Sequence, residues 1–205
     1  MKIICVGWNY PKHNEEMNRV NLPAEPTIFL KPDSSLLRDN KPFFIPRFSN
    51  RIEHEIEIVV RIDKLGKNIE ERFAHRYYSH VALGVDFTAR DLQNKFKESG
   101  QPWELSKGFD NSAVISEFVP IAQLGTNIND INFELYKNNS LVQKGNTSQM
   151  IFSVDKIIEF VSKYFTLKIG DLIYTGTPNG VGTVAINDCL EGFIEGNRLL
   201  DFYVK

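Results

Sequence analysis

The segment RIEHEIEIVVRID, at residues 51–63, places two acidic side chains inside a run of strong strand-forming residues. The strand formers are Ile56, Ile58, Val59, Val60 and Ile62. Glu55 and Glu57 lie two positions apart, so a strand directs both side chains to the same face of a sheet. Like charges side by side on one face destabilise a sheet unless a cation offsets them. The segment therefore predicts a strand whose acidic pair has a cationic partner.

The composition is that of an ordinary globular chain, with 42% hydrophobic and 24% charged residues in a length of 205. This length accommodates one domain with a substantial core, which we expect to span residues 1–205. The formal net charge is −2, so no strong field draws the chain to nucleic acid or to an anionic membrane. No apolar run approaches the roughly 18 residues that a membrane helix needs.

The N-terminus and the cysteines favour a cytoplasmic location. The opening residues, MKIICVGWNYPKH, contain too short an apolar run for a signal peptide and soon become polar. Cys5 and Cys189 form no CxxC motif. We expect both to be buried, reduced thiols, as suits a reducing compartment.

The hydrophobic pattern along the chain predicts many short strands and few helices. Strands are expected at residues 1–7, 26–32, 54–62, 81–87 and 198–205, with a hairpin at 132–147 that turns at Asn138-Asn139. Helices are expected at residues 11–20, at 69–80, from Thr88 to Gly100, and at 153–165 with Ser153 as its N-cap. This distribution indicates a β-rich α+β domain, and it leaves the topology open.

The acidic pair is a candidate metal site, because a divalent cation would turn the repulsion between Glu55 and Glu57 into attraction. Asp86 is a candidate third ligand, since it ends the apolar strand VALGVD, where a charge is out of place. Carboxylate oxygens suit Mg²⁺ or Mn²⁺, and no Cys/His spacing predicts zinc. Three monodentate carboxylates leave about half of an octahedral shell for water or substrate. The alternative is a solvated strand face on which the glutamates pair with Lys or Arg.

His13 and Glu16 form a second candidate site near the N-terminus. Residues three apart on a helix are neighbours, so the carboxylate would lie beside the imidazole. That contact fixes the histidine tautomer and raises its basicity, as a general base that activates water requires. The alternative is a surface histidine near the start of a helix.

Three further segments offer groups that could bind an anion. In DFTARDLQ (86–93), Arg90 follows a predicted helix start whose amides face outward, although it could equally pair with Asp91 on the helix surface. Lys107, in QPWELSKGFD, could hold a substrate carboxylate or an enolate oxygen, or be solvated. The glycine-rich TGTPNGVG (175–182) is neither a P-loop nor a dinucleotide fingerprint. It is either a tight turn or a ring of backbone and threonine donors around a small anion.

Together these segments resemble the fumarylacetoacetate hydrolase family over essentially the whole chain. The matching segments, in order, are GWNYPKHNEE (7–16), TIFLKP (27–32), HEIEIVVRI (54–62), GVDFTARDLQ (84–93), GQPWELSKGFD (100–110) and GDLIYTGTPNGVG (170–182). The resemblance is closest to short, single-domain members related to acylpyruvate hydrolases and oxaloacetate decarboxylases. It implies a β-roll or sandwich of mixed sheets with few short helices, and a homodimer.

The resemblance also implies roles for individual residues. It assigns Mg²⁺ or Mn²⁺ binding to Glu55, Glu57 and Asp86, catalysis to His13, Glu16 and Lys107, and substrate binding to Arg90, Gln93 and Thr177. His13 and Glu16 would lie on a segment that orders over the substrate as a lid. One departure is Trp8, which stands where relatives often carry an arginine, so that this chain lacks a charged donor there.

The activity implied is hydrolysis or decarboxylation of a small 2-oxo acid through a metal-stabilised enolate. The substrates would be acylpyruvates, cleaved at a C–C bond by water, or oxaloacetate, which would lose CO₂. An alternative within the same chemistry is an isomerase or tautomerase of 2-hydroxy-dienedioate compounds from aromatic-ring degradation. An alternative of another class is a non-catalytic β-rich binding protein.

Overall fold

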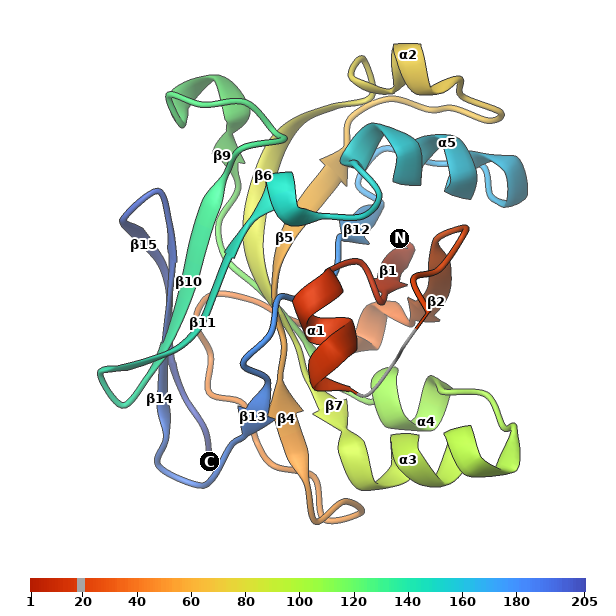
Figure 1. Ribbon diagram of the computed structural model, residues 1–205. Helices are drawn as coiled ribbons and strands as arrows, with labels where there is room; N and C mark the ends of the chain where they lie inside the picture. The colour runs from red at the N-terminus through yellow and green to blue at the C-terminus, as the bar shows by residue number, and fades with distance from the viewer. Residues whose placement is uncertain (18–20) are drawn as a thin grey trace.

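A curled mixed β-sheet and a second, antiparallel sheet form the body of the molecule, and a few short helices lie against one side (Figure 1). The computed structural model describes residues 1–17 and 21–205. Apolar side chains of both sheets meet in one core, including Ile58 and Val60 from one sheet and Phe133 and Phe202 from the other. The expected β-rich α+β class, with mixed sheets and few short helices, is confirmed.

The large sheet mixes parallel and antiparallel pairs. Its strands run in the order β2 (Thr27–Lys31), β1 (Ile3–Gly7), β12 (Leu172–Tyr174), β5 (Ile56–Ile62), β6 (Tyr78–Asp86), β8 (Ala113–Ile115) and β3 (Leu36–Leu37), with β9 (Val119–Pro120) also paired to β6. The pairs β1–β12 and β3–β8 are parallel. The longest strands, β5 and β6, are central and buried on both faces, which explains their nearly continuous apolar sequences.

Two smaller sheets complete the β structure. The antiparallel sheet has the order β11 (Ser140–Asn146), β10 (Asn132–Lys137), β14 (Cys189–Ile194) and β15 (Asn197–Tyr203), and the three-stranded sheet has the order β13 (Gly182–Thr183), β4 (Ile52–His54) and β7 (Thr88–Ala89). The predicted hairpin at 132–147 is confirmed. Its turn residues Asn138 and Asn139 have φ angles of 52° and 64°, which the two central residues of a type I′ turn require.

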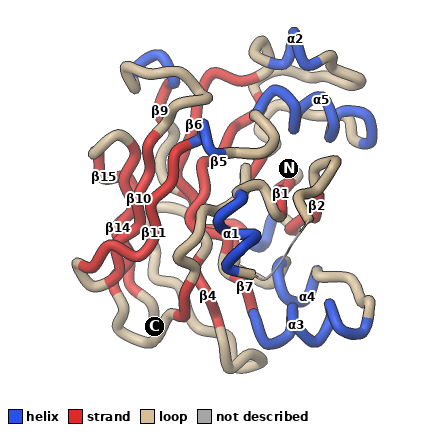
Figure 2. Tube along the Cα trace, viewed as in Figure 1, coloured by secondary structure: helices blue, strands red, loops and turns tan. Residues whose placement is uncertain are grey.

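The helices are short (Figure 2). They are α1 (Pro11–Glu16), α2 (Glu71–Ala74), α3 (Arg90–Ser99), α4 (Glu104–Lys107) and α5 (Val154–Tyr164), with 3₁₀ turns at Asp33–Ser35, Ile121–Gln123 and Thr147–Gln149. In α5 the predicted cap is confirmed, because the Ser153 hydroxyl accepts a hydrogen bond from the Lys156 amide at 3.2 Å. Within the described residues, no helix is long and apolar enough to cross a membrane.

Several expected boundaries were wrong, and strand pairing explains most of them. The helix expected at 69–80 covers only Glu71–Ala74, since Tyr78 already pairs with Ile62 in the sheet. The helix expected from Thr88 begins at Arg90 without a side-chain cap, because Thr88 and Ala89 pair with β4. The helix expected at 11–20 ends at Glu16, and its residues 18–20 lie outside the described part of the chain.

One strand and one cysteine also differ from expectation. The strand expected at 54–62 is interrupted, since Glu55 lies between β4 and β5 and belongs to neither. Cys5 is buried as expected, whereas Cys189 is partly exposed because it begins β14 on the face whose side chains are only partly buried. Both thiols are free.

The break at Glu55 is what brings the acidic residues together. Here the chain leaves the three-stranded sheet at β4 and enters the large sheet at β5, and it passes back after Asp86, where β6 gives way to β7. The Asp86 amide donates to the Glu55 carbonyl at 2.8 Å, so the two transitions lie side by side. The junction of the sheets therefore positions Glu55, Glu57 and Asp86.

We predict that Ser153→Ala lowers stability by about 1 kcal/mol, because it removes the acceptor at the start of α5. For a chain of this size that loss lowers Tm by about 2–4 °C, which thermal denaturation would measure. Ser153→Asp is the matched control, since it retains a capping oxygen and should melt like the wild type. Equal melting of all three proteins would contradict the assigned cap.

Candidate active site

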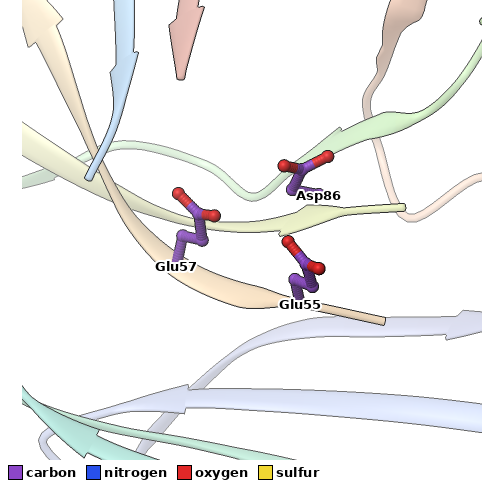
Figure 3. Close-up of side chains that lie close together, drawn as sticks. All are labelled: Glu55, Glu57 and Asp86. Carbon is purple, nitrogen blue, oxygen red and sulfur yellow. The ribbon is translucent and has the colours of Figure 1, made fainter. Parts of the chain in front are cut away.

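Glu55, Glu57 and Asp86 form a buried acidic triad. Each has a carboxylate oxygen within 4.8 Å of those of the other two. Their exposed fractions are 5%, 2% and 0%, so the alternative of a solvated strand face is wrong. Figure 3 shows the three side chains pointing into a common space from two neighbouring chain segments. Such an arrangement is costly unless opposite charge is present.

Lys107 supplies part of that opposite charge. Its ammonium lies 2.7 Å from Glu55 Oε2, 2.7 Å from Asp86 Oδ2 and 2.6 Å from Thr88 Oγ1. The side chain is 3% exposed, so the alternative of a solvated lysine is wrong. Burial by itself lowers the pKa of Lys107, but Asp86 and Glu55 outweigh it and raise that pKa above its usual value. Lys107 is therefore a fixed positive charge beside the triad.

Arg90 forms the second positive group and lies inside the site. Its Nε donates to Glu53 at 2.6 Å, and its other nitrogens donate to Glu55 and to Gln93 Oε1. The alternative of a surface pair with Asp91 is wrong. The Asp91 carboxylate instead accepts hydrogen bonds from the Ser49 hydroxyl and the Asn50 amide.

Lys31 is the third positive group, and the sequence analysis missed it. Its ammonium lies 2.7 Å from Asp86 Oδ1 and is fully buried. It donates to Ser112 Oγ at 2.9 Å, to the Ser112 carbonyl at 3.1 Å and to the Lys107 carbonyl. A signal was present, because a lysine that ends the apolar strand TIFLK is as much out of place as Asp86. Glu53, the partner of Arg90, was also missed, although it lies two positions before Glu55, because the strand was expected to begin at residue 54.

The acids of this cluster are unevenly paired. The buried acids are Glu53, Glu55, Glu57 and Asp86, the buried cations are Lys31, Arg90 and Lys107, and the exposed Arg51 also pairs with Glu53 at 2.7 Å. Among the described residues Glu57 has no ion-pair partner, and its Oε2 accepts only the Gly176 amide, at 2.7 Å. Burial, Asp86 and Glu55 raise the pKa of Glu57 well above its usual value. For Glu55, burial is outweighed by Lys107 and Arg90, which lower its pKa.

The triad fits a divalent cation. Its donors are three hard carboxylate oxygens, the kind that Mg²⁺ and Mn²⁺ prefer. Asp86 Oδ1 lies 2.7 Å from the Lys31 ammonium but accepts no hydrogen bond from the described residues, so it retains lone pairs for a cation. The unbalanced charge of Glu57 also calls for a cation at this place.

His13 and Glu16 approach the same cavity from α1. His13 Nδ1 lies 3.3 Å from Glu16 Oε2, and His13 is 6% exposed, so the alternative of a surface histidine is wrong. Glu16 Oε1 accepts the Gly180 amide at 3.1 Å, which ties α1 to the glycine-rich loop. Although burial raises the pKa of Glu16, the hydrogen bonds from His13 and Gly180 lower it overall. The imidazole also stacks on Trp8, with ring centroids 6.1 Å apart.

The cavity brings together every predicted site residue except Glu16, which reaches it through His13. Its wall is formed by Val6, Gly7, Trp8, His13, Phe29, Glu55, Glu57, Asp86, Arg90, Gln93, Trp103, Lys107 and Thr177. The polar groups form its floor, and the three aromatic rings Trp8, Phe29 and Trp103 contact one another at centroid distances of 6.0 and 6.3 Å. The free volume is ≈ 30 Å³, room for only about one or two waters.

We predict that Glu57→Gln stabilises the metal-free protein at neutral pH. A carboxyl whose pKa is raised by folding costs stability as pH rises from its unfolded value of about 4.3 toward the folded pKa. In EDTA the variant should therefore melt above the wild type at pH 7, and the difference should vanish near pH 4.

Added Mg²⁺ should reverse that order. At 100 times its Kd it would stabilise the wild type by about 2.7 kcal/mol, and Glu57→Gln by much less. A variant that melts below the wild type in EDTA would contradict the assigned charge imbalance.

We predict that Lys31→Met destabilises the protein by about 3–5 kcal/mol, because it leaves the buried Asp86 with one cation fewer. The matched control is Lys41→Met, whose ammonium is 66% exposed and 3.7 Å from Asp39. That exposed pair is worth at most about 1 kcal/mol. Denaturant unfolding at pH 7 would measure both variants, and similar losses would contradict the role of Lys31 in compensating Asp86.

The comparisons with known proteins agree with this geometry. Residues 2–200 match the family model described as fumarylacetoacetate (FAA) hydrolase C-terminal. The mitochondrial oxaloacetate tautomerase FAHD1 of Mus musculus is 42% identical over 203 residues, which cover 99% of this chain and 91% of the mouse protein. The oxaloacetate tautomerase YcgM of Escherichia coli K12 is 37% identical over 198 residues, covering 97% and 90% respectively.

A solved structure is similar over the whole fold. It is the fumarylpyruvate hydrolase of Pseudomonas aeruginosa in complex with Mn²⁺ and pyruvate, with a TM-score of 0.93 and 33% identity, covering 100% of this chain and 89% of that one. The match of the family model to nearly the whole chain, together with these relatives, establishes that the chain belongs to the fumarylacetoacetate hydrolase family.

Proposed function

We propose that this protein is a metal-dependent enzyme that forms and stabilises the enolate of a small 2-oxo acid. The observation that carries the proposal is one cavity lined by a buried acidic triad and by a histidine paired to a glutamate. Glu55, Glu57 and Asp86 would hold Mg²⁺ or Mn²⁺, which when bound supplies a Lewis acid that stabilises negative charge on an oxygen. The melting measurements on the wild type and Glu57→Gln, in EDTA and with Mg²⁺, test this metal dependence.

The charges of the cavity favour an anionic substrate. In the buried cluster Glu57 alone has no ion-pair partner among the described residues, so a divalent cation held there would leave excess positive charge. The 2-oxo acid group of such a substrate brings a carboxylate beside the oxo group, and its enolate develops a further negative charge on the oxo oxygen. Lys107, fixed beside the triad, would stabilise that further charge more than the neutral ketone, which is the differential interaction that catalysis requires.

His13 would be the proton-transfer group. When its Nδ1–H donates to Glu16, the other ring nitrogen carries the lone pair and is available to a substrate carbon or a water. The carboxylate of Glu16 also stabilises the imidazolium that forms once the proton has moved. The stack on Trp8 holds the ring plane during that transfer.

Keto–enol tautomerisation of oxaloacetate is the reaction we place first. It requires only that a proton leave carbon and return to oxygen, which a single histidine can carry out. It is supported by the two tautomerase relatives, which align with nearly all of this chain. Decarboxylation of oxaloacetate would instead break the bond to its second carboxylate, leave the enolate of pyruvate, and be distinguished by the release of CO₂.

Hydrolysis of an acylpyruvate is the second candidate. Here His13 would activate a water for attack on the distal carbonyl, after which pyruvate leaves as its enolate. It is supported by the likeness to the fumarylpyruvate hydrolase. The isomerase of 2-hydroxy-dienedioates uses the same groups and remains the third reading. The relatives are named as enzymes, which counts against a non-catalytic binding protein.

The test follows oxaloacetate and acetylpyruvate by NMR with Mg²⁺ and with EDTA. Enol loss without pyruvate identifies the tautomerase, pyruvate with acetate identifies the hydrolase, and pyruvate with CO₂ identifies the decarboxylase. No metal-dependent change in either compound, with Mg²⁺ bound, would refute these three reactions and point to the isomerase. The expected homodimer and cytoplasmic location stay predictions, which sedimentation equilibrium and cell fractionation would test.

We predict that His13→Gln lowers kcat by about 10²–10⁴-fold, the usual contribution of a general acid–base group. The stabilisation by Mg²⁺ should be unchanged, because the triad is intact. Lys12→Gln, at the exposed neighbouring position, is the control and should retain full activity. Full activity of His13→Gln would assign the proton transfer to another group.

A further inference from the structure

We propose that Gln143 is a positioning residue that orients the Thr177 hydroxyl so that its hydrogen points into the cavity. There the hydroxyl donates a hydrogen bond to an oxygen of the substrate carboxylate. This inference rests on the proposed function for the identity of the ligand. Gln143 lies on β11 of the antiparallel sheet, in none of the six segments that carry the family resemblance. Its side chain nevertheless reaches the active site and is 1% exposed.

Two backbone groups fix the orientation of the Gln143 amide. The Ile56 N–H donates to Oε1 at 3.0 Å, and Nε2 donates to the Pro178 carbonyl at 3.0 Å. If the amide were flipped, N–H would face N–H and carbonyl would face carbonyl. A backbone N–H can only donate and a carbonyl can only accept, so the assignment of oxygen and nitrogen is unique.

The same Oε1 settles the tautomer of His54. His54 Nδ1 lies 2.9 Å from it, and because Oε1 has no hydrogen, Nδ1 must carry one. His54 ends β4, directly before Glu55 of the triad. The amide oxygen of Gln143 thus holds both sides of the break between β4 and β5.

The amide nitrogen settles the direction of the Thr177 hydroxyl. Nε2 lies 2.9 Å from Thr177 Oγ1 and can only donate to it. The Thr177 hydrogen therefore points away from Gln143, and among the described residues it has no acceptor. Thr177 lines the cavity together with Glu57 and Lys107 and is 3% exposed. Its hydrogen is left for a ligand that accepts, as a carboxylate does.

The loop that carries Thr177 is pressed against β11, which keeps this contact short. Gly180 has a φ of +97°, and a Cβ built there would lie 2.2 Å from the Val142 carbonyl oxygen. Only glycine permits this approach. Gly180 thus allows the loop to lie close enough for Thr177 to contact Gln143.

Gln143→Glu reverses the direction of the hydroxyl with almost no change of shape. A carboxylate oxygen in place of Nε2 accepts the Thr177 hydrogen and so withdraws it from the cavity. Thr177→Val removes the hydroxyl altogether. A residue that acts through Thr177 should have no effect once Thr177 is gone, so the double variant separates positioning from a merely structural role.

The experiment measures the Kd of oxalate, a planar dianion shaped like the enolate of a 2-oxo acid, for the Mg²⁺-loaded protein by calorimetry. We expect Gln143→Glu and Thr177→Val each to weaken binding about 10-fold or more, as loss of a hydrogen bond to a charged group does. The double variant should bind no more weakly than Thr177→Val alone. Gln149→Glu adds the same charge at an exposed position and should bind like the wild type.

A loss from Gln143→Glu that persists undiminished in the Thr177→Val background would overturn the inference and leave the proposed function intact. A wild-type protein that binds Mg²⁺ but not oxalate would overturn both. If Gln143→Glu does not fold, Gln143→Met replaces it in the same cycle, since it frees the hydroxyl to rotate and should also act only through Thr177.

The ¹⁵N NMR spectrum of the His54 ring provides a readout independent of ligand. It should show a hydrogen on Nδ1 and none on Nε2 in the wild type. The opposite tautomer would contradict the amide orientation on which the inference depends.

Discussion

The structure depends on a cluster of four carboxylates and three cations that the fold removes from water. Each charge alone would be costly in a low-dielectric interior, and the cluster persists because every cation contacts a carboxylate and most remaining donors have acceptors. The arrangement falls short of neutrality at Glu57, which hydrogen-bonds a backbone amide but has no ion-pair partner among the described residues. That unpaired charge is the physical basis of the proposed metal site. Glu57 therefore lowers the stability of the metal-free protein and would bind the metal that the reaction needs.

The apolar core of the sheets offsets the free-energy cost of burying this cluster. Strands β5 and β6 are buried on both faces and bring a large apolar area to the core, which offsets the cost of the polar floor at their ends. The site lies where these two strands meet the three-stranded sheet. The hydrogen bond from the Asp86 amide to the Glu55 carbonyl therefore sets the distance between the two carboxylates. Side chains held at the ends of well-packed strands are better positioned than side chains on free loops. The groups from α1 and the glycine-rich loop meet this rigid floor from the other side.

Sequence reasoning found the residues that are chemically out of place. Glu55 and Glu57 in a strand, Asp86 at the end of an apolar run and His13 beside Glu16 are visible as local contradictions, and the resemblance to a family gave them an order. It missed Lys31 and Glu53, which offer the same contradiction, and it missed Gln143, which offers none. A buried glutamine on an amphipathic hairpin looks like any polar strand residue until its partners at His54 and Thr177, 89 and 34 positions away, are known.

The sequence by itself determined the β-rich class, the hairpin at Asn138-Asn139 and the capped helix α5, because turn chemistry and periodicity are local properties. Misplaced charge made Glu55, Glu57 and Asp86 candidates, and the family resemblance grouped them. Only the tertiary structure decided that Glu55 lies in a break between two sheets, that Tyr78 and Thr88 belong to strands, and that Lys107 and Arg90 are buried among the acids. The reason is that pairing across strands and the neutralisation of buried charge join residues distant in the chain. The free energies of strand pairing and of charge neutralisation exceed the local secondary-structure propensities on which prediction from sequence relies.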